Sequence, residues 1–494
     1  MDMHSANLPW LSLLMLLLLA GAGLTALAPA HKARWAALLS TVVALTVTLI
    51  IVAGFDRELS GFQFVETRPW IPTLNIHYLV GVDGISLLFL PATSILFLLV
   101  ILASWNAIHS LSRLYFVLLL LFQTVVIGIF TSLDTILFFL FWELSLVPLY
   151  FLVAVWGLGP NRRYAGTKYV LFMMAGGLPL LLAFVILAIQ TDGSYVFDYP
   201  GLMAVAGENP YQLIVFIMLL VGFGVKTPLV PMHTWLPVMA LEGHPATLAT
   251  IVGLKLGAYG ILRFVLPLLP DVALDYQWLL AGLGITGVIY GAVAALSQTN
   301  LRRMLAYASL SHVGLVIVGL TTFSTQGLQG AVFQLLNFTL IASGLFLLTG
   351  FLQQRIGSTD IISLGGVAKS MPLLTSFFLF LGLASMGIPG TSGFPAELLI
   401  ILSAFKAYTG VGLATLFAMV LSAAYFLGTY RKAFLGPAVR ESVIDAVDLK
   451  KRELLMMVLI SLLVLAFGFF PQAILDIIAS AEGNWQSLLS PAKP

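Results

Sequence analysis

Long apolar segments separated by short polar stretches dominate this chain of 494 residues. A helix needs about 20 apolar residues to cross the hydrocarbon core of a bilayer. Strand-length runs with alternating polarity are absent, so the pattern favours an all-α, polytopic membrane bundle over a β-barrel. Fourteen predicted transmembrane helices begin near Leu8, Trp35, Gly84, Leu114, Thr135, Thr167, Gln212, Pro245, Trp278, Met304, Gly330, Met371, Gly412 and Leu454.

The positive charges test this count separately, because Lys and Arg accumulate in cytoplasmic connections. Of the 23 Lys and Arg residues, 16 fall in connections after odd-numbered spans, whereas five, including Arg263, fall in the other connections or the two ends. Lys226 and Lys255 lie inside spans. We therefore predict that both ends of the chain are non-cytoplasmic. The first apolar segment has no basic residue before it, so we expect a retained span rather than a signal peptide.

Composition excludes several classes of protein. The chain is 60% hydrophobic and 9% charged, and its mean hydropathy is +1.04, whereas soluble domains contain roughly 25% charged residues. This composition predicts lipid as a partner. The net charge is +2 and there is no basic stripe, so we expect no nucleic-acid partner. The absence of cysteine excludes disulfides and iron–sulfur clusters held by this chain. We expect no cofactor in it.

Five ionisable side chains lie inside predicted spans: Glu143, Lys226, Lys255, His312 and Glu397. A charge at the bilayer centre costs about 2.5 to 3.5 kcal/mol on insertion scales. Burial disfavours the charged form of each group, so these side chains could exchange protons near neutral pH. A static ion pair that fixes helix packing is the competing interpretation. Five groups on five helices favour a proton pathway, because an ion pair needs only two.

Two of these charges lie in segments that predict broken helices. The sequence GFGVKTPLVPMHTWLP (222–237) contains Lys226, and GIPGTSGFPAE (387–397) ends at Glu397. Their prolines remove backbone donors. Unwound backbone at membrane depth is tolerated where it is buried in protein or lines a hydrated cavity.

The spacing of the charges predicts two inverted five-helix repeats, each with a broken helix. Glu143 precedes Lys226 by 83 residues and His312 precedes Glu397 by 85. Because five is odd, the second repeat enters the membrane from the opposite side. The predicted divisions are N-terminal helices 1–3 (1–112), repeat 1 (113–267), repeat 2 (268–432), and a cytoplasmic loop with helix 14 (433–494).

Six motifs make the chain similar to a known family. They are VGVDGISLL (80–88), FFLFWELSLVPLYFLVAVWG (138–157), KTPLVPMHTWLP (226–237), LRRMLAYASLSHVGLV (301–316), GIPGTSGFPAE (387–397) and DLKKRE (448–453). Together they resemble the antiporter-like subunit M, or chain 4, of NADH:quinone oxidoreductase (complex I). The resemblance covers nearly the whole chain.

This resemblance implies that the chain is a membrane-arm subunit that translocates protons. The complex would be a proton-translocating NAD(P)H or ferredoxin:quinone oxidoreductase, with other membrane-arm subunits as partners. It implies that Glu143 and Lys226 form an ion pair, that Lys255 is the central lysine, that His312 belongs to the polar chain of the second half, and that Glu397 lies nearest the exit. It implies no cofactor and no redox chemistry in this chain. The expected location is a bacterial inner membrane or a thylakoid membrane.

The chain departs from the family pattern at two places. Val238-Met239-Ala240 stands where the family usually has Asp-Ala-His, and Phe338 stands where a histidine is often found. These departures are consistent with a divergent paralogue. The alternatives are a subunit of an Mrp-type cation/proton antiporter or membrane-bound hydrogenase, a specialised complex coupled to inorganic-carbon uptake, and a scaffold that pumps nothing.

Two other patterns have simpler explanations. GLGITG (282–287) fits a dinucleotide-binding pattern, but it lies inside a predicted span without a preceding strand, so we expect close helix packing. His233 and His244 lack a third ligand at helical spacing, so we expect no metal site.

Overall fold

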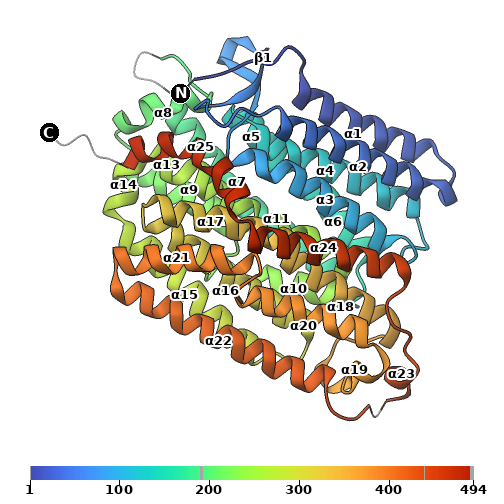
Figure 1. The fold of residues 1–494 in the computed structure, drawn as a ribbon. Helices are drawn as coiled ribbons and strands as arrows, with labels where there is room; N and C mark the ends of the chain where they lie inside the picture. Colours follow the sequence, from blue (N-terminus) through green and yellow to red (C-terminus); the bar gives the residue numbers. More distant parts are fainter. Residues whose placement is uncertain (1, 190–192, 439, 490–494) are drawn as a thin grey trace.

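The computed structural model describes residues 2–189, 193–438 and 440–489, and its long helices run side by side (Figure 1). Twelve segments in this part of the chain are helical, long and apolar enough to cross a membrane. Nine are single helices, and three are helices joined end to end. They are α1 (Trp10–Leu27), α2 (Ala30–Ala53), α3 (Ser86–Ser104), α4 (Ser112–Thr131), α5 and α6 (Thr135–Leu144, Leu146–Trp156), α7 (Arg162–Ala188), α11, α12, η3 and α13 (Pro245–Leu254, Leu256–Gly260, Ile261–Val265, Leu266–Leu268), α15 (Gln277–Leu296), α16 (Leu301–Thr321), α17, η4 and α18 (Thr325–Asn337, Phe338–Ala342, Ser343–Ile356), α22 (Thr409–Phe434) and α24 (Lys451–Phe469).

The two remaining predicted spans are interrupted, as their prolines and glycines predict. The first consists of α9 (Gln212–Lys226) and α10 (Trp235–Glu242), and the second of α20 (Pro372–Ser385) and α21 (Gly393–Ala407). Every predicted span therefore has a helical counterpart. The number of membrane crossings stays a prediction, because these half-helices are short, and so does the division into two repeats.

An antiparallel hairpin follows α2 and is an addition to the predicted all-α class. It pairs β1 (Gln63–Ile71) with β2 (Ile76–Val82), and the 3₁₀ turn η1 (Pro72–Leu74) connects them. The Glu66 carboxylate accepts a 2.7 Å hydrogen bond from the backbone N of Leu11. Because the first amides of a helix lack intrahelical partners, this contact fixes the start of α1. This stretch lies between the second and third predicted spans, where the apolar pattern predicts no helix or strand.

Short elements lie at both ends of the bundle (Figure 1). The end that carries β1 also carries α8 (Tyr199–Val205), η2 (Ala206–Glu208), α14 (Pro270–Asp275) and the C-terminal α25 (Gln472–Leu489). The other end carries η5 (Ile361–Ser363), α19 (Val367–Ser370) and α23 (Glu441–Ile444). The elements at the first end follow even-numbered predicted spans and those at the second end follow odd-numbered ones, and which end is cytoplasmic stays a prediction.

Candidate functional site

Lys226 is the last residue of α9, because Pro228 and Pro231 cannot continue the backbone hydrogen bonds of the helix. Its Nζ donates a 2.8 Å hydrogen bond to Oγ of Ser145 and a 3.3 Å bond to the backbone O of Trp142. The same Nζ lies 3.9 Å from the centroid of the Trp142 ring. The buried ammonium is therefore held by neutral groups and a π face.

Glu143 of α5 does not form the expected direct ion pair with Lys226. No carboxylate oxygen of Glu143 lies within 4.0 Å of Nζ of Lys226. Oε1 of Glu143 has no hydrogen-bond partner among the described residues, and it points at Gly177 of α7, where a Cβ would overlap it. The physical reason is that Ser145 and Trp142 engage the ammonium instead.

Lys255 lies at a third helix break, which the sequence analysis did not predict. It separates α11 from α12 and has a φ of 42°, in the left-handed region, where a non-glycine residue is strained. Its side chain is buried, and Nζ lies 5.0 Å from the centroid of the Phe338 ring. Gly253 and Gly257 flank the break, and this pair of glycines was the available signal.

The segments of the two lysines pack directly on each other. A Cβ at Gly257 would overlap the backbone N and Oγ1 of Thr227, the residue after Lys226. A cavity of about 20 Å³ next to Lys226 is also lined by Thr250 and by the neighbours of Lys255, Leu254 and Leu256. This volume holds about one water molecule. This small internal space therefore extends from Lys226 to the two residues that flank Lys255, whereas Lys255 itself does not line it.

His312 of α16 and Glu397 of α21 meet in the second half. Nδ1 of His312 lies 3.6 Å from Oε1 of Glu397 and 3.5 Å from Nε2 of Gln334. Nε2 of His312 lies 3.4 Å from Oη of Tyr425. Asn337 donates a 3.1 Å hydrogen bond to Oε1 of Gln334. The structure thus brings two predicted residues together and adds Gln334 and Tyr425. The signal for Gln334 was a polar residue within an apolar span.

A second cavity, of about 40 Å³, adjoins this cluster. Its lining includes His312, Gln334, Ser309 and Phe338. Oγ of Ser309 and Oε2 of Glu397 are buried without a hydrogen-bond partner in the described part of the chain. Buried polar atoms normally have partners, and ordered water is a common one. The cavity has room for up to about three water molecules, so it can hold water beside His312 and Tyr425.

Comparisons with known proteins identify the family to which this chain belongs. The model of the family described as NADH:quinone oxidoreductase/Mrp antiporter, TM matches residues 132–422, more than half of the chain. The chain belongs to this family. NADH-quinone oxidoreductase subunit M of Rickettsia prowazekii (strain Madrid E) is 35% identical over 454 residues, which are 91% of this chain and 92% of the relative. Subunit M of Mycobacterium tuberculosis (strain ATCC 25618 / H37Rv) is 34% identical over 530 aligned positions, covering 99% and 96%.

Two solved structures have the same fold. A chain of respiratory complex I from Thermus thermophilus with bound NADH matches with a TM-score of 0.88 and 30% identity, covering 97% of this chain and 100% of that chain. A chain of the Mrp complex from Dietzia sp. DQ12-45-1b matches with a TM-score of 0.86 and 22% identity, covering 99% and 98%. This member of the NADH:quinone oxidoreductase/Mrp antiporter family is thus an integral membrane subunit with many transmembrane helices.

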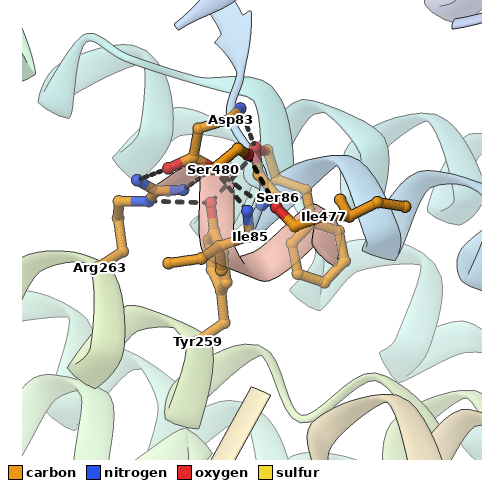
Figure 2. A network of polar contacts seen from close by, with 8 residues as sticks. Asp83, Ile85, Ser86, Tyr259, Arg263, Ile477 and Ser480 are labelled. Atoms are coloured by element: carbon orange, nitrogen blue, oxygen red, sulfur yellow. Dashed lines mark hydrogen bonds and ion pairs between the residues drawn. The ribbon is translucent and has the colours of Figure 1, made fainter. Parts of the chain in front are cut away.

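One buried ion pair of this family member lies outside the predicted set (Figure 2). Arg263 donates from Nη1 to Oδ2 of Asp83 at 2.7 Å and from Nη2 to Oδ1 at 2.6 Å. Nε of Arg263 donates a 3.3 Å bond to Oη of Tyr259. Burial alone would raise the pKa of Asp83, but the guanidinium outweighs it and holds that pKa below its usual value. The prediction that Arg263 lies in a connection between spans is wrong, because the π turn η3 continues the helix through this residue.

The same ion pair lies beside the C-terminal helix. Figure 2 shows Ile477 and Ser480 of α25 next to the Asp83 segment. A Cβ at Gly84 would overlap the backbone O of Ile477 and Oγ of Ser480. The hairpin end, the helix after Lys255 and α25 therefore meet at one point.

The DLKKRE motif stabilises the opposite end of the family member. The Asp448 carboxylate accepts hydrogen bonds from the backbone N atoms of Leu373 (2.7 Å) and Leu374 (3.0 Å) at the start of α20. Glu453 forms a buried ion pair with Arg355, the penultimate residue of α18. The side chains of Asp448 and Glu453 thus connect helices and do not approach the titratable clusters.

The close helix packing expected at GLGITG is present in the structure. Gly284 and Gly287 of GLGITG pack against α16, where a Cβ at either position would lie within 3.4 Å of Gly314 or Val318. The described residues contain no group of three His, Cys, Asp or Glu that could hold a metal ion. His244 caps α11 by accepting from the backbone N of Ala246 at 3.3 Å.

Proposed function

We propose that this chain translocates protons in the membrane arm of a complex I-type quinone oxidoreductase, while partner subunits carry out electron transfer. The observation that supports it most is that Lys226 and Lys255 are buried at helix breaks, and neither forms an ion pair among the described residues. A static ion pair would offset the cost of burying each charge. Without that compensation, both lysines can release a proton more readily than a surface lysine.

The proposed pathway runs from Glu143 and Lys226 through Lys255 to His312 and Glu397. The ammonium group of Lys226 can move between the Glu143 carboxylate and the Ser145 hydroxyl, because both lie near the end of α9. Movement toward the neutral Ser145 weakens the hold of Lys226 on its proton. A charge change in a neighbouring subunit that acts on Glu143 would therefore drive the proton toward Lys255.

The finer assignments follow from the relatives. We propose NADH as the electron donor of the complex, because relatives that are 34% and 35% identical are named NADH-quinone oxidoreductase subunit M. Those relatives are bacterial, which supports the inner membrane as the location. Electrons would bypass this chain, which has no cysteine to hold an iron–sulfur cluster.

An Mrp-type cation/proton antiporter subunit is the second candidate, supported by the shared fold with the Dietzia complex. The two functions differ in what drives proton movement. Proton transport that needs NADH and quinone supports the first, whereas transport driven by a Na⁺ gradient without an electron donor supports the second.

The experiment uses the purified complex in proteoliposomes with NADH, a quinone and a fluorescent ΔpH indicator. We expect Lys226→Ala and Glu143→Gln to reduce proton transport at least about tenfold, which corresponds to about 1.4 kcal/mol, in a complex that is still assembled. Lys406→Ala is the matched control, because Lys406 is exposed and its Nζ donates a hydrogen bond to Oε1 of Gln326, away from the titratable clusters. Normal transport by both test variants would refute the proposal.

A further inference from the structure

The ring of Phe338 lies beside two members of the proposed pathway. Nζ of Lys255 is 5.0 Å from the ring centroid. The ring centroids of Phe338 and His312 are 6.4 Å apart, with an interplanar angle of 79°. Phe338 is buried, so the central lysine and the first histidine of the second half both face one aromatic side chain.

Neither ring nitrogen of His312 is directed to Lys255 by a hydrogen bond. Nδ1 is engaged by Glu397 and Gln334, and Nε2 by Tyr425. A phenyl ring has no lone pair that accepts a proton and no acidic hydrogen to donate. A proton therefore cannot pass through the ring itself, and a route from Lys255 to the His312–Glu397 pair past Phe338 needs bridging water.

The structure provides space for such water on the His312 side. Phe338 and His312 both line the cavity of about 40 Å³, and the unpartnered Oγ of Ser309 lies in the same wall. Lys255 is not among the lining residues. The ring of Phe338 thus stands at the boundary between the lysine and a space that has room for water.

The backbone that carries Phe338 is attached to the helix that ends at Lys255. Phe338 begins the π turn η4, a conformation often found at functional sites. Oγ1 of Thr339 donates a 3.1 Å hydrogen bond to the backbone O of Gly253, and Oγ of Ser343 donates a 2.9 Å bond to the backbone O of Ala249. A shift of α11 therefore also moves the Phe338 segment.

We propose that Phe338 is the gate of the second half: its ring separates Lys255 from the His312–Glu397 pair, and protons pass only when water enters beside it. This inference rests on the proposed function. A charged Lys255 attracts the ring face, so the gate stays closed while the lysine holds its proton. When α11 shifts, the ring moves, water connects the two sites, and the proton leaves Nζ for the His312–Glu397 pair.

The test compares Phe338→His, Phe338→Leu and Phe346→His in the assembled complex in proteoliposomes. Phe346 lines the same cavity, whereas the aromatic ring next to Nζ of Lys255 is that of Phe338, so Phe346 is the matched control. The readouts are the passive proton leak without NADH and the ratio of protons moved to electrons transferred.

We expect Phe338→His to raise the passive leak several-fold and to lower the proton-to-electron ratio, since imidazole can relay protons. Phe338→Leu and Phe346→His should keep the wild-type leak, because an apolar side chain still fills the boundary in both. Two results would overturn the gate. One is a wild-type leak and a wild-type proton-to-electron ratio in Phe338→His, and the other is a leak in Phe338→Leu as large as that in Phe338→His. If Lys226→Ala abolishes pumping in the same vesicles while Phe338→His behaves as wild type, only the gate fails. If Lys226→Ala also pumps normally, the proposed function fails.

Discussion

Replacing Asp83 by Asn should loosen the contact between the β2–α3 connection and the helix that follows Lys255. The substitution keeps the shape of the side chain but leaves the buried Arg263 without its negative partner. Removing one member of a buried ion pair costs about 3 to 5 kcal/mol. We expect a value near 3 kcal/mol, because the amide oxygen of Asn can keep one guanidinium bond and Tyr259 keeps another.

Hydrogen exchange of the purified complex measures this loss locally. A decrease of about 3 kcal/mol should speed exchange in residues 256–268 roughly a hundredfold, while residues 451–457 at the other end stay unchanged. The double variant Asp83→Asn/Arg263→Met should recover part of the protection, because no charge is left uncompensated. Wild-type exchange in Asp83→Asn, or a double variant equal to the sum of the two single variants, would refute the reasoning.

Two further substitutions test close contacts. Gly177→Ala places a Cβ on the Glu143 carboxylate, which lies at the end of a flexible side chain and must turn away. Because Glu143 begins the proposed pathway, NADH-driven proton transport should fall several-fold. Gly23→Ala, which meets open space, should leave transport unchanged, and equal transport by the two variants would contradict the contact. Asp448→Ala removes the cap of α20; a lost cap costs about 1 kcal/mol, so exchange in residues 372–385 should rise about fivefold, and unchanged exchange would mean that water replaces the cap.

The sequence predicts most of the helices of the bundle, because the apolar residues within a segment are enough to identify it as a span. The breaks at Lys226 and before Glu397 are predictable for the same reason, since proline acts on the backbone next to it. The five titratable positions stand out because each is a polar residue in an apolar segment. That His312 meets Glu397 could be expected only from the resemblance, because it depends on how α16 packs on α21.

The features that sequence reasoning missed depend on contacts between distant segments. Lys255 adopts a positive φ without a proline nearby, and its break forms where Gly253 and Gly257 let neighbouring helices approach closely. Arg263 looked like a charge in a connection because its partner, Asp83, is 180 residues away. The Glu143–Lys226 ion pair was what the family resemblance implied, whereas Ser145, a short polar side chain in the same motif, accepts the hydrogen bond.

The chemistry of the side chains separates structural charges from transport charges in this protein. Two of the three ion pairs in the described part of the chain contain arginine, Arg263 with Asp83 and Arg355 with Glu453. They tie helices together near the two ends of the bundle, where a permanent charge is useful because arginine does not release its proton. The positions between them carry lysine, histidine and glutamate, which do exchange protons. Arg263→Lys should therefore weaken the bidentate contact with Asp83. Lys255→Arg should block proton transfer, although the side chain stays positively charged. Measurements of proton transport and of local hydrogen exchange in the same two variants test this contrast.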